Sequence, residues 1–402
     1  MNVGSSRTIR WFGAVVFMTA LTVRSVAADW PNFLGPRYDG KSDEKGFKTN
    51  WTEPLKLVWE RNVGSAFSSF ACVGNRVYTC GAQDKQQVLY CLNADTGEVI
   101  WQKPFEKEYR NEHGDGTRAT PTVNDGRVYI LGANGLLLCV DANTGADVWR
   151  QQFNHQPTWA YAGSVLIEGD LAIASAGKDD GALVAFNKKT GDPVWKCGDD
   201  PVGYSTPYPF TFNGQRYIVG FMGNSALIAE AKTGREVWRM PWKTDWDVNA
   251  ASPIFSDGYL FLTSGYTTGC ALLKLAADGD KLTSTTVWKS DVLMNKFQSC
   301  ILHEGKLYGS DQNALKCVDF LTGQEHWKKP RMRNGTLILA DRYFLFLTEG
   351  GQLQIAKPSP EDFAPVSTAD ILTGRCWTVP VLNNGRLFAR NLDRVVCFDL
   401  RR

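Results

Sequence analysis

The sequence predicts an all-β protein, an eight-bladed β-propeller, and three observations carry this prediction. A motif recurs along the chain with a period of 38–48 residues, which is the length of a propeller blade. Each period divides into short β-rich runs separated by turn dipeptides. The last period lacks a fourth strand, whereas an isolated strand stands near the N-terminus.

The motif is a Thr-Gly pair followed by Trp four residues after the glycine. Five full copies are CLNADTGEVIW (91–101), CVDANTGADVW (139–149), AFNKKTGDPVW (185–195), IAEAKTGREVW (228–238) and CVDFLTGQEHW (317–327). Three eroded copies begin at positions 273, 355 and 397, which brings the total to eight. The repeat residues are therefore Trp59, Trp101, Trp149, Trp195, Trp238, Trp288 and Trp327, with Gly97, Gly145, Gly191, Gly234 and Gly323.

The repeat residues have structural roles. In segment 119–141, the turns Asn124-Asp125-Gly126 and Asn134-Gly135 separate three strands, and the Thr-Gly turn leads to a fourth that carries the Trp. The glycine is expected to supply the positive φ of a tight turn. The indole is expected to fill the wedge between twisted blades, as part of the core and not as a ligand platform.

The strand LVWERNV (57–63) is expected to close the ring. Its Trp59 precedes Trp101 by 42 residues, one repeat period. Pairing with the last blade would remove the exposed sheet edges. The predicted organisation is a signal peptide over residues 1–28, an N-terminal extension over 29–54 and a propeller over 55–402.

Residues 1–28 resemble an export signal in composition. Arg7 and Arg10 form a basic start, an apolar run of 13 residues follows, and Val26-Ala27-Ala28 provides small residues at a cleavage position. The apolar run is short of the about 20 residues that a membrane span needs. We expect the segment to be removed, with a retained membrane anchor as the alternative.

The charges of the mature chain are balanced. Removal of residues 1–28 takes away three arginines and no acidic residue, so that 44 basic and 42 acidic side chains become 41 and 42. Without a basic block, we expect no nucleic-acid partner. We expect an exported monomer, in the periplasm or cell envelope, with no transmembrane span once the signal is removed.

The ten cysteines do not suggest a disulfide framework. Cys91, Cys139, Cys317 and Cys397 occupy the same place in four repeats, too far apart to bond, and resemble small buried apolar residues. Cys80 and Cys91 flank one hairpin and remain a candidate pair. The chain has no CxxC motif for haem or zinc, and no metal site is predicted.

The Thr-Gly-x-x-x-Trp repeats resemble the tryptophan-docking repeats of pyrroloquinoline quinone (PQQ) enzymes, which are shared with BamB-type outer-membrane assembly lipoproteins. Residues 29–402 more closely resemble a PQQ-like propeller family of planctomycete-type bacteria. The matching blocks are DWPNFLGPRYDG (29–40), TRATPTV (117–123), DVNAASPI (247–254), SGYTTGCALL (264–273) and CWTVPVL (376–382). For the PQQ enzymes, the resemblance implies an aromatic floor, bound Ca²⁺, a carboxylate base and an arginine near the quinone.

Loops that lead into inner strands usually form the ligand mouth of a propeller. Here they supply candidate ligand-binding residues, which are Asp115, Arg118, Trp159, Tyr161, Trp246, Asp247, Asn249, Arg375 and Trp377, and later loops add Lys296. Structural roles are the alternative: Asp247 and Asn249 capping a turn, Arg118 paired with Asp115, and Trp246 packed in a blade.

Two functions compete. The vicinal Cys-Cys disulfide and long insertions of alcohol-oxidising quinoproteins are absent, no Glu–Asn–Asp calcium set is identifiable, and the four histidines form no close pair. We therefore favour a non-catalytic scaffold of the cell envelope that binds a protein, a peptide or a carbohydrate. The alternative is a PQQ- and calcium-dependent oxidoreductase acting on an alcohol or sugar, followed by a hydrolase or lyase on the same scaffold. No catalytic residue is assigned.

Overall fold

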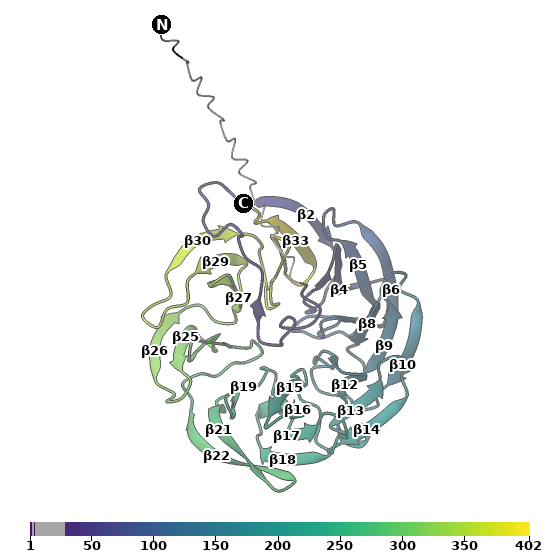
Figure 1. Ribbon diagram of the computed structural model, residues 1–402. Helices are drawn as coiled ribbons and strands as arrows, with labels where there is room; N and C mark the ends of the chain where they lie inside the picture. Colours follow the sequence, from purple (N-terminus) through teal and green to yellow (C-terminus); the bar gives the residue numbers. More distant parts are fainter. Residues whose placement is uncertain (2–3, 5–28) are drawn as a thin grey trace.

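Eight antiparallel sheets surround a central axis in the computed structural model, as Figure 1 shows. The predicted eight-bladed β-propeller is confirmed. The structure describes Met1, Gly4 and residues 29–402, so the expected signal peptide over 1–28 otherwise lies outside the described residues. Among the described residues, no helix is both long and apolar enough to cross a membrane.

Each blade has four strands ordered from the axis outward. The first four blades are β3–β6 (Ala71–Val73, Arg76–Gln83, Gln86–Asn93, Val99–Lys107), β7–β10 (Thr122–Asn124, Arg127–Leu131, Leu136–Asp141, Asp147–Gln152), β11–β14 (Leu166–Glu168, Leu171–Ser175, Leu183–Asn187, Pro193–Cys197) and β15–β18 (Tyr208–Phe212, Gln215–Phe221, Ser225–Glu230, Glu236–Pro241). The next three are β19–β22 (Ile254–Ser256, Tyr259–Ser264, Gly269–Asp278, Lys281–Ser290), β23–β26 (Ile301–His303, Lys306–Ser310, Ala314–Asp319, Glu325–Pro330) and β27–β30 (Thr336–Ala340, Tyr343–Leu347, Gln352–Ala356, Pro365–Asp370).

The eighth blade is built from both ends of the chain. Its inner strands are β31 (Val381–Asn383), β32 (Arg386–Arg390) and β33 (Arg394–Asp399), and its outer strand is β2 (Lys56–Asn62). β2 pairs antiparallel with β33, with Trp59 opposite Cys397. The closing strand thus begins and ends one residue earlier than the segment 57–63.

A buried arginine reinforces the seam between the last and the first blade. Arg390, at the end of β32, is 0% exposed. Its guanidinium donates to six oxygens on both sides of the seam: the carbonyls of Gly64, Ser68, Cys80, Asn391 and Leu392, and the hydroxyl of Thr79. Burial lowers the pKa of Arg390 to about 10, so the group remains a cation at neutral pH.

Each blade docks on its neighbour through the repeat tryptophan and glycine. The indole of one blade lies against the repeat glycine of the next, in the pairs Trp59–Gly97, Trp101–Gly145, Trp149–Gly191, Trp195–Gly234 and Trp288–Gly323. A Cβ on Gly97 would lie 2.5 Å from the ring of Trp59, and the φ of Gly97 is +71°. The glycine is therefore required both by its backbone and by the indole that covers it.

The indoles also bond across the blade junctions. Five donate to a backbone carbonyl of the next blade at 2.9–3.0 Å: Trp59 to Ala94, Trp101 to Ala142, Trp149 to Lys188, Trp288 to Phe320 and Trp327 to Ser359. Trp238 donates instead to the hydroxyl of Ser284, in the elongated β21–β22 hairpin. Within the described residues, the buried Nε1 of Trp195 has no partner.

This difference between Trp149 and Trp195 gives a matched test. Trp149 and Trp195 are 8% and 9% exposed, so phenylalanine at either position removes similar volume. We expect Trp149→Phe to lose about 1 kcal/mol more unfolding free energy than Trp195→Phe, because only Trp149 loses a hydrogen bond. Urea denaturation measures both values, and equal losses would show that the indole N–H contributes nothing to docking.

The N-terminal extension crosses one face of the ring, as the purple chain in Figure 1 shows. Its Trp30 pairs with Cys72 in the first blade, and its strand β1 (Lys41–Ser42) adds to β27 in parallel. Phe47 then pairs with Arg401 beside the eighth blade. Trp30 and Phe47 are each 1% exposed, so the extension is packed into the propeller as a strap.

The blade without a repeat tryptophan is completed by the same extension. In β30, Ser367 pairs with Ile355, at the position where other blades carry the Trp. The hydroxyl of Ser367 donates to Asn50, and Trp51 Nε1 donates to the carbonyl of Thr368 at 3.1 Å. Residues of the extension thus occupy the place left by the eroded repeat.

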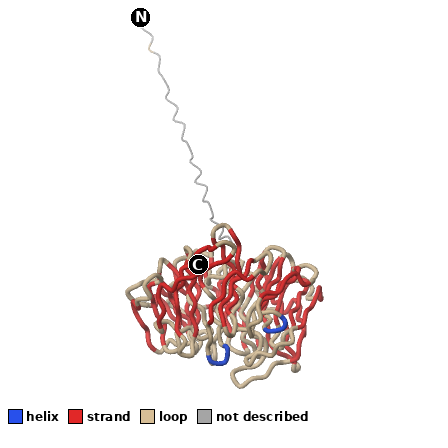
Figure 2. Tube along the Cα trace, turned by 90° about the horizontal axis from the view of Figure 1, so that it is seen from below, coloured by secondary structure: helices blue, strands red, loops and turns tan. Residues whose placement is uncertain are grey.

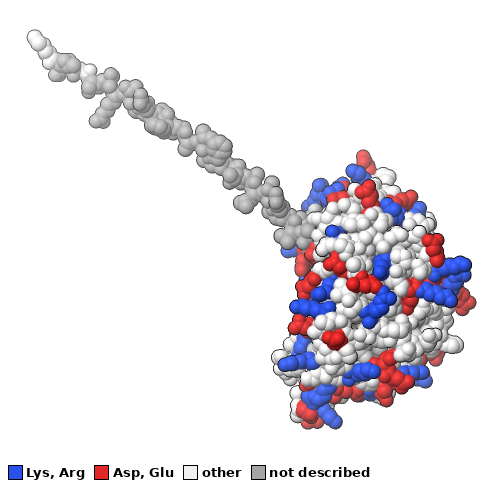
Figure 3. Space-filling model, turned by 90° about the vertical axis from the view of Figure 1, so that its right-hand side faces the viewer, with Lys and Arg blue, Asp and Glu red and all other residues white. Residues whose placement is uncertain are grey.

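The two faces of the disc differ. Inner strands begin at the face where long loops join consecutive blades, here called the mouth face, and end at the face that the extension crosses, here called the extension face. Both short 3₁₀ turns, η1 (Lys178–Asp180) and η2 (Asp245–Asp247), lie in the lower half of the disc as drawn in Figure 2. Basic and acidic side chains are interspersed over the side shown in Figure 3.

All ten cysteines lie within residues 29–402, and each is a buried free thiol there. Cys80 stands opposite Leu89 and Cys91 opposite Tyr78 in the β4–β5 ladder. The two cysteines are therefore diagonal neighbours, a placement about 7–8 Å apart that exceeds disulfide reach. The candidate Cys80–Cys91 disulfide is not formed. Burial raises the pKa of Cys80 to about 12.

Candidate functional site

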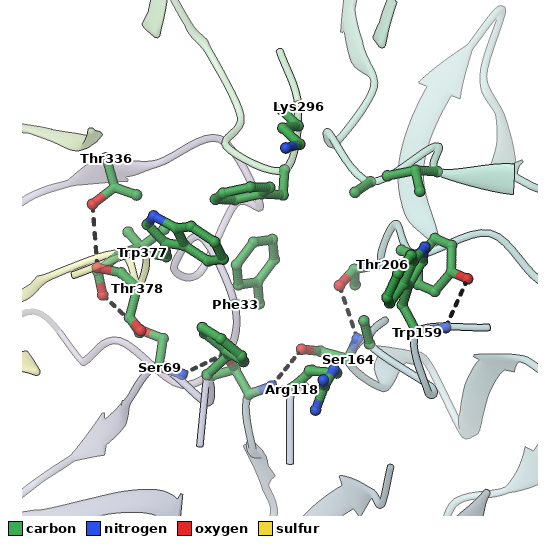
Figure 4. A pocket seen from close by; sticks show the side chains of 18 of the residues that line it. Phe33, Ser69, Arg118, Trp159, Ser164, Thr206, Lys296, Thr336, Trp377 and Thr378 are labelled. Carbon is green, nitrogen blue, oxygen red and sulfur yellow. Dashed lines mark hydrogen bonds between the residues drawn. The ribbon is translucent and has the colours of Figure 1, made fainter. Parts of the chain in front are cut away.

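A cavity of about 260 Å³ opens at the mouth face of the channel. It is lined by the loops that join consecutive blades and, from the extension face, by Phe33 of the extension. Figure 4 shows Phe33 at the centre of the view, with Trp377 on one side and Trp159 on the other. The extension therefore reaches the channel and contributes to the wall of the cavity.

A ring of buried hydroxyls surrounds the channel. Seven blades place Ser or Thr just before or at the start of the inner strand, namely Ser69, Thr120, Ser164, Thr206, Ser252, Ser299 and Thr336. Several of these hydroxyls accept the amide of the preceding blade: Ser69 N donates to Thr120, Thr120 N to Ser164, Ser164 N to Thr206 and Ser252 N to Ser299, at 2.9–3.1 Å. These hydrogen bonds connect neighbouring blades close to the axis, and Figure 4 shows some of them as dashed lines.

The walls of the cavity are aromatic. Trp377 stacks on Phe67 with ring centroids 5.6 Å apart and an interplanar angle of 17°, and it contacts Phe297 at 4.6 Å. Tyr204, whose hydroxyl accepts the amide of Trp159 at 3.2 Å, and Tyr266 lie among the other lining residues. Because the lining joins residues far apart in the sequence, the cavity exists only in the closed ring.

Arg118 is the buried cation of the site. Its guanidinium donates to the carbonyls of Gly114 and Gly116 and stacks over the rings of Tyr109 and Phe67, at 4.5 and 5.5 Å. Burial lowers the pKa of Arg118 to about 10, so the group stays charged at neutral pH. The alternative pairing of Arg118 with Asp115 is not seen, because the two form no ion pair within 4 Å.

Aromatic side chains continue from the cavity onto its rim. His113 contacts Trp159 with ring centroids 5.1 Å apart, and Trp159 contacts Trp246 at 6.4 Å. Trp246 is 64% exposed and has a φ of +63°, a conformation that costs free energy for a bulky residue. We call His113, Trp159 and Trp246 the rim aromatics.

The structure brings together some of the residues singled out from the sequence. Arg118, Trp159 and Trp377 line the cavity, and Lys296 lines it too. Arg375 lies at the rim, where it donates to the carbonyl of His113 and stacks over Trp377 at 4.5 Å. Trp246 is exposed beside Trp159 rather than packed in a blade.

Four other candidates lie outside the lining. Asp115 accepts the amide of Asn111 at 2.7 Å within its own loop. Tyr161 is 1% exposed, and its hydroxyl donates to the carbonyl of Ala176. Asn249 is 0% exposed and donates to Met222 and Trp242, while Asp247 lies in η2 beside Gly223. Through these bonds the side chains of Asp115, Tyr161 and Asn249 hold their loops in place.

Sequence reasoning missed much of the lining. The hydroxyl ring had a signal, since ATP (119–121), STP (205–207) and ASP (251–253) recur before inner strands. Phe67, Phe297 and Tyr266 sit in loops that carry no repeat pattern. Phe33 comes from the extension, and nothing in the sequence indicates that this segment reaches the channel.

The sequence matches a known family over most of its length. The family is described as outer membrane protein assembly factor BamB, and the matches cover residues 51–197, 84–329 and 225–402. The chain belongs to the BamB family. Curated relatives with that name come from Burkholderia pseudomallei (27% identity, 47% of this chain and 60% of that protein) and Yersinia pestis (22% identity, 72% of this chain and 74% of that protein). The first match thus spans less than two thirds of the relative's length.

Solved structures agree with the fold of this BamB-family chain. BamB from Moraxella catarrhalis has a TM-score of 0.63 and 17% identity, covering 86% of this chain and 99% of its own. Quinohemoprotein alcohol dehydrogenase from Comamonas testosteroni has a TM-score of 0.64 and 13% identity, covering 92% and 80%. At such identities the likeness shows the fold alone.

The cavity residues do not fit the calcium–quinone group of the dehydrogenases. Ca²⁺ takes about six to eight oxygen ligands, with carboxylates prominent among them. The lining contains hydroxyls, Asn111 and two cations, but no Asp or Glu side chain among the described residues. Elsewhere in residues 29–402, no group of three or more His, Cys, Asp or Glu could hold a metal ion.

Proposed function

We propose that this BamB-family chain is an exported propeller that serves as a ligand-binding and protein-interaction scaffold in the cell envelope. The observation that carries the proposal is the aromatic-walled cavity, whose rim presents the exposed Trp246 at positive φ. Exposed tryptophans beside a pocket are frequent anchors of protein interfaces. Export is supported by the composition of residues 1–28.

The proposed partner is an envelope protein that contacts the mouth face. The relatives named outer membrane protein assembly factor BamB support a role in protein assembly. The rim supports a protein ligand as well, because Trp246 extends the aromatic contacts of the lining residues His113 and Trp159 onto the exposed surface. A segment of a partner chain would contact this surface while one residue enters the cavity.

A photo-reactive aromatic residue at position 246 tests this function. Trp246 is replaced in the full chain by p-benzoylphenylalanine, which preserves an exposed aromatic group at the rim. Irradiation in cells is expected to yield a discrete adduct with one envelope protein. The same residue at Leu321, 52% exposed in a Thr-Gly turn on the extension face, is the matched control.

The two positions give opposite expectations. An adduct from position 246 that is absent from position 321 supports a partner at the mouth face. Adducts from both positions, or from neither, would contradict the proposed function. The aromatic walls and Arg118 would suit a PQQ-dependent oxidoreductase, but the lining offers no carboxylate among the described residues as a base or a calcium ligand, so this function is not favoured.

A further inference from the structure

The lining of the cavity includes basic side chains but, among the described residues, no acidic ones. Arg118 and Lys296 belong to its lining. The ammonium of Lys296 stacks over the rings of Tyr266 and Phe297, at 5.2 and 5.9 Å, and has no carboxylate within 4 Å in the described part of the chain. Figure 4 shows Lys296 and Arg118 on opposite sides of the cavity. The ammonium of Lys296 therefore has no acidic partner in the described part of the chain, whereas Asp115 acts on Arg118 from its own loop.

Carboxylates near the wall are engaged elsewhere. Glu349 accepts Trp377 Nε1 at 2.6 Å and faces Arg333 at 3.3 Å, on the outer side of the indole. Asp115 accepts the amide of Asn111. Neither carboxylate pairs with Lys296, so its ammonium is available to a ligand anion.

The hydroxyl ring adds neutral donors on another wall. Thr120, Ser164 and Thr206 line the cavity and are 2%, 3% and 6% exposed. Each hydroxyl oxygen accepts a neighbouring amide, but within the described residues none of the three hydroxyl protons has an acceptor. A hydroxyl can donate one bond while it accepts others. The cavity thus offers three hydroxyl groups that can each donate a hydrogen bond to an acceptor oxygen of a ligand.

The remaining surface of the cavity is apolar. Phe33, Phe67, Phe297 and Trp377 are aromatic members of its lining. A volume of about 260 Å³ accommodates one amino-acid residue with a large side chain rather than a folded element. The complementary ligand has a carboxylate, further acceptor oxygens and an apolar body.

We propose that the cavity binds the C-terminal residue of a partner polypeptide, through its carboxylate at Lys296 and its apolar side chain over Phe33 and Trp377. A terminal residue carries the carboxylate, the adjacent peptide carbonyl and the apolar group in one unit. Arg118, whose guanidinium is fixed on the carbonyls of Gly114 and Gly116, adds to the positive field. This inference rests on the proposed function, since it names the part of the partner that enters the site.

Three small probes of shared shape test the proposal on the full chain by titration calorimetry. N-acetyl-L-phenylalanine imitates a chain terminus, and its amide, N-acetyl-L-phenylalaninamide, has the same body without charge. We expect the acid to bind at least about tenfold more tightly than the amide, and its affinity to fall as salt is raised. 3-Phenylpropionate, a free acid without the peptide group, is expected to bind more weakly than the N-acetylated acid. Tighter binding of 3-phenylpropionate would assign the site to a free carboxylic acid instead and overturn the proposal.

A pair of lysine variants locates the charge that the probe senses. Lys296→Met is expected to lower the affinity for N-acetyl-L-phenylalanine by about tenfold. The affinity for N-acetyl-L-phenylalaninamide is expected to stay unchanged. Lys289→Met is the matched control, because Lys289 also stacks on an aromatic ring, Trp242 at 5.6 Å, but lies outside the cavity lining. Circular dichroism verifies that both variants are folded. Equal affinities of acid and amide, or equal effects of the two variants, would overturn the proposal.

The two proposals fail in different ways. If the adduct at position 246 forms and Lys296→Met leaves its yield unchanged, the terminal-carboxylate inference is wrong while the scaffold function stands. If the acid binds through Lys296 but position 246 yields no adduct, the cavity is a small-molecule site and the protein-interaction scaffold is wrong. Loss of the adduct in Lys296→Met, but not in Lys289→Met, supports both.

Discussion

Gly97→Ala is expected to lower the unfolding free energy by about 2–5 kcal/mol. A residue with a side chain at the φ of +71° costs about 1–2 kcal/mol. The new Cβ would also lie 2.5 Å from the ring of Trp59, and such overpacking costs about 1–3 kcal/mol. Urea denaturation followed by circular dichroism measures the loss. The effect is large because Trp59 belongs to β2, the strand that closes the ring.

Gly126→Ala separates the two causes. Gly126 has a φ of +72°, but no atom lies within 4 Å of the position that its Cβ would occupy. This variant should therefore lose only the backbone contribution, about 1–2 kcal/mol. If Gly97→Ala and Gly126→Ala destabilise the protein equally, the indole of Trp59 does not require a glycine.

Arg390→Met is expected to destabilise the protein by about 2–4 kcal/mol. Methionine occupies a similar length but leaves the six oxygens that Arg390 bonds without this donor, and unmade buried bonds are costly. Relief of the buried charge offsets part of the loss. Arg390→Lys should not restore stability, because a single ammonium cannot reach the oxygens that the guanidinium spans. Urea denaturation midpoints at constant slope provide the measurement.

Arg386→Met is the control on the same strand. Arg386 also spans the seam to the first blade, but it does so through an ion pair with Asp95, whose side chain is 48% exposed. Partly exposed pairs contribute about 0–1 kcal/mol. A loss in Arg390→Met no greater than that in Arg386→Met would mean that the buried guanidinium is not what holds the seam.

The ring could be predicted from the sequence because each blade repeats its own local signals. Asn134-Gly135 marks a hairpin, Gly97 marks a tight turn, and Trp101 marks an outer strand, so each copy reinforces the count. The docking bonds could not be predicted in full: Trp195 has the same motif as Trp149, yet its N–H lacks a partner among the described residues. Whether the indole finds a carbonyl depends on small shifts in the neighbouring blade.

The site was less predictable, because it is made where non-repeating loops meet. Residue type and loop position indicate Arg118, Trp159 and Trp377 as ligand-binding residues, and all three line the cavity. The same criteria indicate Asn249, but its side-chain amide donates to the carbonyls of Met222 and Trp242 and does not reach the cavity lining. Polar side chains in such loops either bind a ligand or hold the loop in place. Only their burial and their hydrogen-bond partners, which the structure shows, distinguish the two roles. Phe33 could not be predicted as a lining residue, because it lies in the N-terminal extension. That segment has no repeat motif from which its path could be inferred.

The path of the strap also determines how the disc would stand on a surface. Asp29 accepts the amide of Gly74 at the hairpin turn of the first blade, on the extension face. Any attachment made through the chain before Asp29 would hold that face toward the supporting surface. The mouth, with Trp246 at its rim, would then be directed outward, so that tethering and partner capture would occur on opposite poles of the molecule without steric competition.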